Sequence, residues 1–183
     1  SYYVPFVVKL LKDSQVKVCT VVGFPLGASP KEVKSLEAKL ALDQGAHEID
    51  MVINIGALKD ELYSTVEEDI KTVAETCHQN DGILKVILET CLLSNEEIVK
   101  ACELCQSAGA DFVKTSTGFS NAGANFEVVE LMKKTVGDKL QVKASGGVKT
   151  PADAKKMIEI GANRIGTSSG IKLISGQDSN SSY

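Results

Sequence analysis

The chain has 183 residues, of which 43% are hydrophobic and 24% charged, with a formal net charge of -4. This length is enough for one sizeable core, the acidic balance offers no surplus of cations to nucleic acid or anionic lipid, and no window has the roughly 18 continuous apolar residues of a membrane helix. We therefore expect a cytoplasmic globular protein without a nucleic-acid or membrane partner.

Short β-branched segments alternate with amphipathic segments along the whole chain. An initial helix in residues 1–15 comes first. The predicted strands cover residues 17–25, 48–56, 84–90, 112–118, 141–147 and 164–170. The predicted helices between them cover residues 29–46, 62–80, 94–110, 125–138 and 150–162. Strand starts lie 23 to 36 residues apart, which is the length of one βα unit in a parallel sheet.

Proline and glycine mark the ends of several predicted helices. Ser29-Pro30 and Thr150-Pro151 precede the first and the last of these helices, where proline suits the first turn. Gly45, Gly109 and Gly161 each stand near a helix end and before an alanine. We expect these three glycines to adopt the left-handed conformation of a helix C-cap.

Charged side chains recur on one face of the predicted strands. Because alternate residues of a strand point to opposite faces, Asp50, Lys85, Lys114 and Lys143 share their faces with polar neighbours, and aliphatic residues lie opposite. The spacing fits a doubly wound sheet and a barrel equally. A sheet covered by helices on both faces would bury these charges in apolar layers, whereas a barrel lets opposite charges pair in one interior. We therefore predict an α/β fold of the TIM (β/α)8 barrel type.

Glycine and hydroxyl residues are concentrated in the loops that follow the later strands. Active sites of (β/α)8 barrels lie at these strand ends, and phosphate commonly binds after the last two strands. Gly146, Gly147, Ser168 and Ser169 stand there, where backbone N–H groups and hydroxyls form an anion site. Tight turns without a ligand are the alternative, but adjacent loops of this kind in a barrel favour phosphate.

Two lysines, Lys114 and Lys143, occupy inward positions on neighbouring strands. Mutual repulsion and burial both favour a neutral amine, and a neutral amine can attack a carbonyl carbon to form a Schiff base. A Schiff base stabilises an adjacent carbanion, so carbon–carbon bonds can form or break beside it. The pattern therefore indicates covalent chemistry on a carbonyl substrate.

An acid or base must also move protons in such a reaction. Asp50 is the best-placed carboxyl group for this role, and Glu89 is second. Lys85 lies nearer the start of its strand, and we expect it to form a structural ion pair with Glu48 or another interior carboxylate.

We expect neither the cysteines nor the histidines to take part in catalysis or metal binding. Five cysteines, an odd number scattered through apolar segments, fit reduced and buried thiols better than a disulfide framework. Cys102 and Cys105 form a C-x-x-C motif, but the helical periodicity around them favours a helix position over a zinc or redox site. His47 and His78 are expected on the surface. The cysteines are Cys19, Cys77, Cys91, Cys102 and Cys105.

Five stretches carry a resemblance to a known family. They read EIDMVINIGALK, LKVILETCLL, GADFVKTSTGF, VKASGGVKT and ANRIGTSSG. In this order they resemble the strand signatures of the deoxyribose-phosphate aldolases, the class I aldolases of the DeoC family, over about residues 3–174. The resemblance implies a (β/α)8 barrel that reversibly cleaves 2-deoxy-D-ribose 5-phosphate to D-glyceraldehyde 3-phosphate and acetaldehyde, a step in deoxyribonucleotide and carbohydrate catabolism.

The resemblance also implies roles for individual residues. Lys114 would form the Schiff base, Lys143 would depress its pKa and assist proton transfer, and Asp50 would relay protons. No metal and no cofactor are expected, because the iminium supplies the electrophile. The residues implied for binding the substrate phosphate are Gly118, Gly146, Gly147, Ser168 and Ser169.

Two departures from the family pattern affect these expectations. Some members have a lysine after KTSTG where this chain has Phe119, so we expect Lys172 or backbone amides to serve the phosphate instead. The family's first two strands and first helix have no counterpart here, so residues 1–176 are interpreted as strands 3 to 8 of the barrel, in a fragment of a longer protein. Such a barrel would expose two sheet edges, which puts turnover in question.

The polar tail at residues 177–183 is expected to be disordered. Some family members end in a tyrosine that reaches the active site, and Tyr183 stands in that place.

Two other functions stay open: a sugar-phosphate-binding barrel without turnover, and a related Schiff-base aldolase, such as a transaldolase-like enzyme, acting on another sugar phosphate. The expected partner is a small sugar phosphate, and an outer helix face could support a homodimer.

Overall fold

A computed structural model describes residues 1–178 of the chain. The predictions for the last five residues, including a visit of Tyr183 to the active site, lie outside this range.

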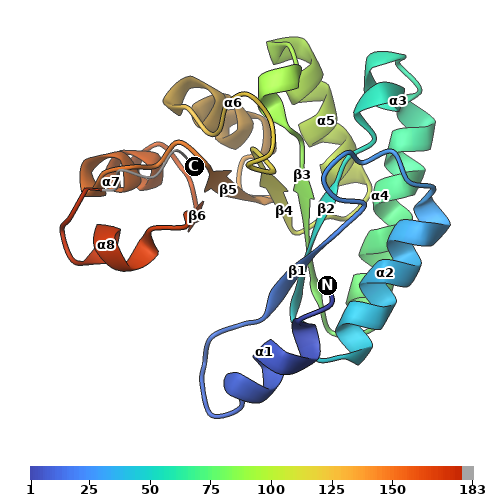
Figure 1. Cartoon of the computed structure of the whole chain (residues 1–183). Coiled ribbons are helices and arrows are strands. Elements are labelled where there is room, and N and C mark those ends of the chain that lie inside the picture. Colours follow the sequence, from blue (N-terminus) through green and yellow to red (C-terminus); the bar gives the residue numbers. More distant parts are fainter. Residues whose placement is uncertain (179–183) are drawn as a thin grey trace.

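Six parallel strands form one sheet whose spatial order is the order of the chain, from β1 to β6. The sheet curls into part of a barrel, with helices along its outer, convex side (Figure 1). This is the truncated (β/α)8 arrangement expected from the sequence. The strands are β1 (Cys19–Val22), β2 (Glu48–Val52), β3 (Ile83–Ile87), β4 (Phe112–Lys114), β5 (Gln141–Ser145) and β6 (Arg164–Gly166).

Helices follow the strands and pack beside one another along the outside of the sheet. Consecutive contacts join α2 to α4, α4 to α5, α5 to α6 and α6 to α7. Within residues 1–178, no helix is long and apolar enough to cross a membrane. The helices are α1 (Val4–Leu10), α2 (Lys31–Asp43), α3 (Ile55–Lys59), α4 (Tyr63–His78), α5 (Asn95–Ser107), α6 (Phe126–Val136), α7 (Pro151–Glu159) and α8 (Gly170–Ile174), with a short 3-10 helix η1 (Thr90–Leu92).

The predicted helix ends are largely confirmed by local hydrogen bonding. Thr150 caps α7 in a reciprocal capping box with Asp153, and proline occupies the first turn, which satisfies backbone N–H groups that the helix itself leaves unpaired. The three cap glycines have positive φ angles, 96° at Gly45, 80° at Gly109 and 114° at Gly161. At the start of α2 the prediction was off by one residue, because Pro30 is itself the N-cap.

Every predicted strand is shorter in the structure than in the sequence pattern, and β3 also begins one residue earlier, at Ile83. The six segments continue past the last ladder pair into loops that line the carboxyl ends of the strands, and α3 and α8 begin there. β-branched and small residues continue beyond the hydrogen-bonded ladder, so these positions share the sequence pattern of a strand. The residues predicted as strand beyond each ladder are therefore the loops that carry the candidate site.

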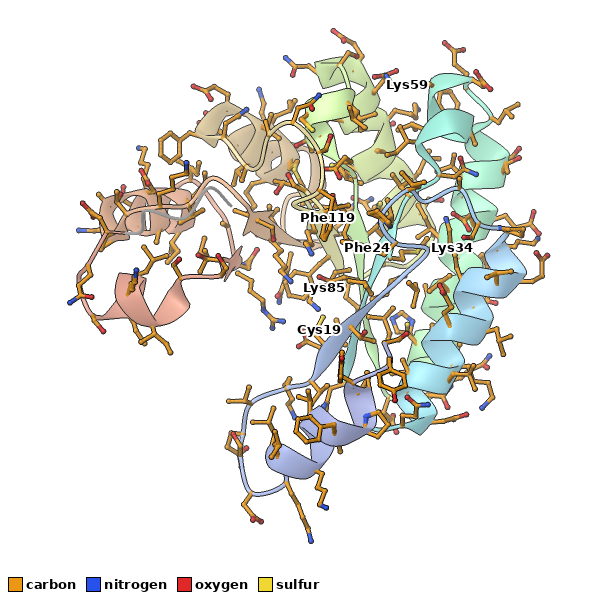
Figure 2. All side chains as sticks on the ribbon, viewed as in Figure 1. Cys19, Phe24, Lys34, Lys59, Lys85 and Phe119 are labelled. Carbon is orange, nitrogen blue, oxygen red and sulfur yellow. The ribbon has the colours of Figure 1, made fainter. Side chains whose placement is uncertain are left out.

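The two faces of the sheet differ in chemistry as predicted. Ile49, Met51, Val86 and Val113 are fully buried against the helices, in one apolar cluster with residues of α2, α4, α5 and α6. Charged side chains occupy the concave side. Figure 2 shows Lys85 on that side. This division supports the barrel over the doubly wound sheet.

The C-x-x-C motif belongs to the apolar layer. Cys102 and Cys105 are fully buried in α5, and burial raises the pKa of the Cys102 thiol to about 12. Cys77 in α4 is equally buried. Cys19 is different, because it is exposed on the concave side of β1, an edge strand that pairs only with β2 among the described residues. The expectation of buried thiols was therefore wrong for Cys19, and Cys91 is only half-buried.

Candidate active site

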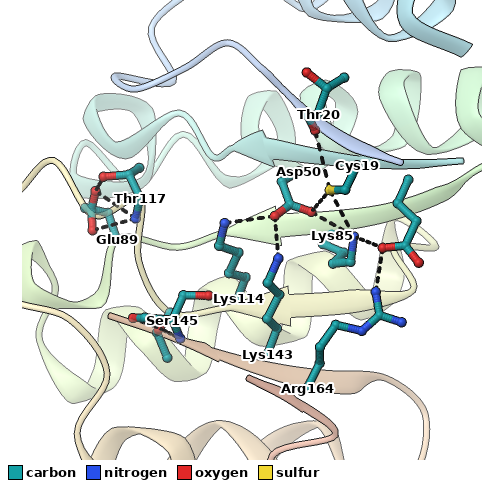
Figure 3. A network of polar contacts seen from close by, with 12 residues as sticks. Cys19, Thr20, Asp50, Lys85, Glu89, Lys114, Thr117, Lys143, Ser145 and Arg164 are labelled. Carbon is teal, nitrogen blue, oxygen red and sulfur yellow. Dashed lines mark hydrogen bonds and ion pairs between the residues drawn. The ribbon is translucent and has the colours of Figure 1, made fainter. Parts of the chain in front are cut away.

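The concave side holds a cluster of lysines around one carboxylate, Asp50 of β2 (Figure 3). The Nζ atoms of Lys114 and Lys143 donate to the same oxygen, Asp50 Oδ2, at 2.8 and 2.9 Å. Lys85 Nζ donates to the other oxygen, Oδ1, at 2.9 Å. The strands bring these groups together, because Lys114 pairs in register with Lys143 and Asp50 with Lys85. The three predicted catalytic residues therefore form one contiguous group.

Electrostatics keeps Asp50 ionised despite its burial. Burial by itself raises the pKa of this carboxyl group, but the positive charges of Lys114, Lys143 and Lys85 outweigh that effect and hold the pKa well below its usual range. Asp50 is 2% exposed and Lys114 7%, so this pairing is screened little by solvent. A carboxylate in this position can exchange protons with either neighbouring amine.

Lys85 has the structural role expected for it. Its side chain is fully buried, and Nζ lies 2.6 Å from a Glu48 oxygen as well as contacting Asp50. Arg164 of β6 pairs with the same carboxylate of Glu48. This chain of ion pairs crosses the concave side from β6 to β2 and β3, so it fixes Asp50 from the side opposite Lys114.

Glu89 does not join the lysine cluster. It adopts a left-handed backbone with φ of 55°, and its carboxylate accepts hydrogen bonds from the backbone N–H of Thr117 at 3.2 and 3.3 Å and from the Thr117 hydroxyl. Glu89 thus ties the loop after β3 to the loop after β4 (Figure 3). In the structure Glu89 therefore stabilises these two loops, and it does not contact the lysines as a proton-transfer group would.

A pocket of about 220 Å³ lies among the loops that follow β4 and β5, the strands that carry Lys114 and Lys143. Three glycines of the predicted phosphate set, Gly118, Gly146 and Gly147, line it with positive φ angles. The two loops touch closely, since a Cβ on Gly147 would stand 2.6 Å from the carbonyl oxygen of Ala124. The lining residues are Gly118, Ser120, Asn121, Ala122, Gly123, Gly146, Gly147 and Lys149.

The remaining predicted phosphate residues are not among those that line this pocket. Ser168 and Ser169 precede α8 in the loop after β6, and neither they nor Lys172, which is exposed on α8, line it. Lys149 supplies an amine instead, and Asn121 supplies an amide. The signal for Lys149 was present in the sequence, because it follows Gly146-Gly147 in the loop already chosen for phosphate.

Cys19 borders the lysine cluster at the open edge of the sheet. Its Sγ lies 3.3 Å from Asp50 Oδ1, and Lys85 Nζ lies 3.5 Å from Sγ. The residue as a whole is exposed, but its sulfur lies against these two side chains. Burial of the sulfur and the negative charge of Asp50 raise the pKa of this thiol to about 11, so the thiol is protonated at neutral pH. Within residues 1–178, no three His, Cys, Asp or Glu side chains gather where a metal ion could bind.

Comparison with known proteins identifies the family. Residues 4–176 match the DeoC/LacD family aldolase pattern. The chain belongs to the DeoC/LacD family of aldolases. The deoxyribose-phosphate aldolase of Carboxydothermus hydrogenoformans is 57% identical over 99% of this chain and 80% of its own length, and that of Thermococcus kodakarensis is 58% identical over 94% and 80%.

A solved structure agrees with this assignment. Deoxyribose phosphate aldolase from Aeropyrum pernix, described as a tetramer, has a TM-score of 0.87 and 34% identity over 95% of this chain and 73% of its own. This DeoC/LacD chain therefore shares both the sequence pattern and the curled parallel sheet of the family, and the resemblance noted in the sequence is confirmed.

Proposed function

We propose that this chain is a class I deoxyribose-phosphate aldolase, which cleaves 2-deoxy-D-ribose 5-phosphate reversibly to D-glyceraldehyde 3-phosphate and acetaldehyde. The observation that carries the proposal is the pair of amines, Lys114 and Lys143, on one oxygen of a buried carboxylate, beside a glycine-lined pocket with a lysine. Membership of the aldolase family supports it.

Lys114 is the nucleophile in this proposal. Transfer of its proton to a neighbouring base leaves a neutral amine, which attacks C1 of the substrate aldehyde; loss of water from the adduct gives an iminium. Lys114 suits this role because it is the last residue of β4, at the end of the sheet where barrel active sites lie.

Asp50 and Lys143 move the protons. A base removes the proton of the C3 hydroxyl, the C2–C3 bond breaks, and its electron pair flows into the iminium to give an enamine and D-glyceraldehyde 3-phosphate. Protonation of the enamine at C2 regenerates an iminium, and water releases acetaldehyde and free Lys114. Asp50 shuttles protons in these steps because it contacts both amines.

The pocket in the loops after β4 and β5 binds the phosphate. Backbone N–H groups of glycines at positive φ can approach the phosphate oxygens without side-chain hindrance, and the Lys149 ammonium adds charge. Ser168 and Ser169 remain candidates for the same phosphate from the loop after β6, since β6 neighbours β5.

Borohydride trapping tests the proposal. The chain is incubated with acetaldehyde and sodium borohydride and then analysed by intact mass and peptide mapping, alongside Lys114→Ala and the surface control Lys39→Ala. We expect a two-carbon adduct at Lys114 in the wild type and in the control, and none at that position in Lys114→Ala. A folded wild type without any adduct would contradict the proposal and would favour a sugar-phosphate-binding barrel without turnover.

A further inference from the structure

Two phenylalanines meet at the mouth of the concave side, although their loops follow strands that are not neighbours. Phe24 stands after β1 and Phe119 after β4, and their rings pack edge to face with centroids 5.4 Å apart and an interplanar angle of 89°. Figure 2 shows the two rings side by side. Because β2 and β3 lie between β1 and β4 in the sheet, the contact spans the carboxyl ends of those two strands.

Both loops are fixed in place by their own hydrogen bonds. In the first loop, Gly23 N–H donates to Glu37 Oε2 at 2.7 Å and Gly27 N–H donates to the Gly23 carbonyl at 2.8 Å. A Cβ on Gly27 would stand 1.9 Å from the carbonyl oxygen of Ile53, so this loop rests directly on the end of β2. The ring of Phe24 is therefore held over the strand that carries Asp50.

The second loop is held in the same way and belongs to the phosphate pocket. Phe119 N–H donates to the Thr117 hydroxyl oxygen at 3.0 Å, and Glu89 binds Thr117 in turn. Phe119 stands between Gly118 and Ser120, which both line the pocket. Its ring therefore lies at the border between the phosphate pocket and the mouth above the lysines.

Core packing does not account for a phenylalanine at position 119. Its side chain is 77% exposed, so the contact with Phe24 hides only a small part of it. An exposed apolar ring that packs on a second ring at the edge of a polar site is suited to contact with the apolar part of a ligand.

We infer that Phe24 and Phe119 form an apolar cover that packs against the carbon chain of the substrate between Lys114 and the phosphate pocket. The inference rests on the proposed function, since it takes the ligand to be an aldehyde sugar phosphate. Contact with the rings positions the carbon chain for bond cleavage and keeps water from the enamine. Phe24 and Phe119 are thus substrate-positioning residues of the aldolase reaction.

The test compares two substrates that differ only in the phosphate. Values of kcat and KM for cleavage of 2-deoxy-D-ribose 5-phosphate and 2-deoxy-D-ribose are measured for the wild type, Phe24→Ala, Phe119→Ala, the double variant and the exposed control Phe6→Ala. We expect kcat/KM to fall roughly tenfold for both substrates in each single variant, the size of one lost aromatic contact. The double variant should lose little more, because the rings act as a pair.

Two further measurements separate this inference from the proposed function. Lys149→Ala should lower kcat/KM for the phosphorylated substrate by a larger factor than for the free sugar, unlike the phenylalanine variants. Borohydride trapping at Lys114 should give equal adduct yields in the wild type and the ring variants. Three results would overturn the apolar cover: kcat/KM of the ring variants within twofold of the wild type, a loss seen only with the phosphorylated substrate, or a double variant that loses the sum of the two single effects. In each case an unchanged adduct at Lys114 would still support the Schiff base of the proposed function.

Discussion

At the scale of single residues, Asp50 determines how the concave side responds to acid. Its pKa is held below the usual carboxyl range because burial, which raises it, is outweighed by three lysines. Unfolded Asp binds a proton near pH 4, so as pH falls below about 4 the unfolded state takes up a proton before the folded state does. The contribution of Asp50 to the free energy of unfolding is thus fully present at neutral pH, and it is lost as pH falls through the pKa of Asp50 in the folded state.

Asp50→Asn tests this pH dependence. The amide cannot neutralise the lysines around it, so we expect the free energy of unfolding at pH 7 to fall by about 3–5 kcal/mol, as for a broken buried ion pair. The variant should also lose part of the acid-dependent slope, measured by urea denaturation between pH 3 and 7. Asp43→Asn, in an exposed pair with Lys39, is the matched control and should change stability by less than about 1 kcal/mol. Equal slopes for Asp50→Asn and the wild type would contradict this account.

At the scale of elements, one buried ion pair joins α2, α4 and β2. Lys34 of α2 is fully buried, and its Nζ lies 2.5 Å from Asp69 Oδ2 of α4 and 3.0 Å from the Val52 carbonyl oxygen of β2. The stem of Lys34 also packs under Gly23, where a Cβ would stand 2.8 Å from it. Burial lowers the pKa of Lys34 and raises that of Asp69, with each partner opposing the shift.

The pair therefore predicts a non-additive response to substitution. Lys34→Met leaves Asp69 buried without its cation, and we expect a loss of about 3–5 kcal/mol in the free energy of unfolding. Lys34→Met combined with Asp69→Leu replaces both charges by apolar groups and should be considerably more stable than the single variant. Chemical denaturation of Lys34→Met, Asp69→Leu, the double variant and the wild type measures the coupling. A double variant that loses the sum of the two single effects would show that the residues act independently.

The order of the elements could be predicted from the sequence because each βα unit repeats the same local pattern. The charged face of Asp50, Lys114 and Lys143 followed from strand alternation, and so did the choice of a barrel. The loops could not be predicted in the same way. The contact of Phe24 with Phe119 and the place of Lys149 in the pocket depend on how distant loops meet, and the exposure of Cys19 depends on which strand lies beside β1.

At the scale of the whole molecule, the sheet has two edges. Within the described part of the chain, β1 pairs only with β2 and β6 only with β5, so each edge presents backbone groups without a strand partner. Parallel edges of this kind are templates for pairing with another chain. Phe6 and Leu10 on α1 are also more than half exposed, and α1 lies close to β1 in Figure 1.

We expect these 183 residues to self-associate with increasing concentration, because edge pairing and apolar contact both favour a second copy at β1. Sedimentation velocity over a hundredfold concentration range should show the weight-average sedimentation coefficient rising. Val21→Lys adds a charge to the half-buried concave side of this edge strand, and charged edge residues oppose pairing, so its coefficient should rise less. Lys17→Glu changes a charge just before β1 without adding one to the strand, and serves as the control. A monomer at every concentration would show that the edges are protected by their own twist and by α1, and the concave side would then be open to substrate in a single chain.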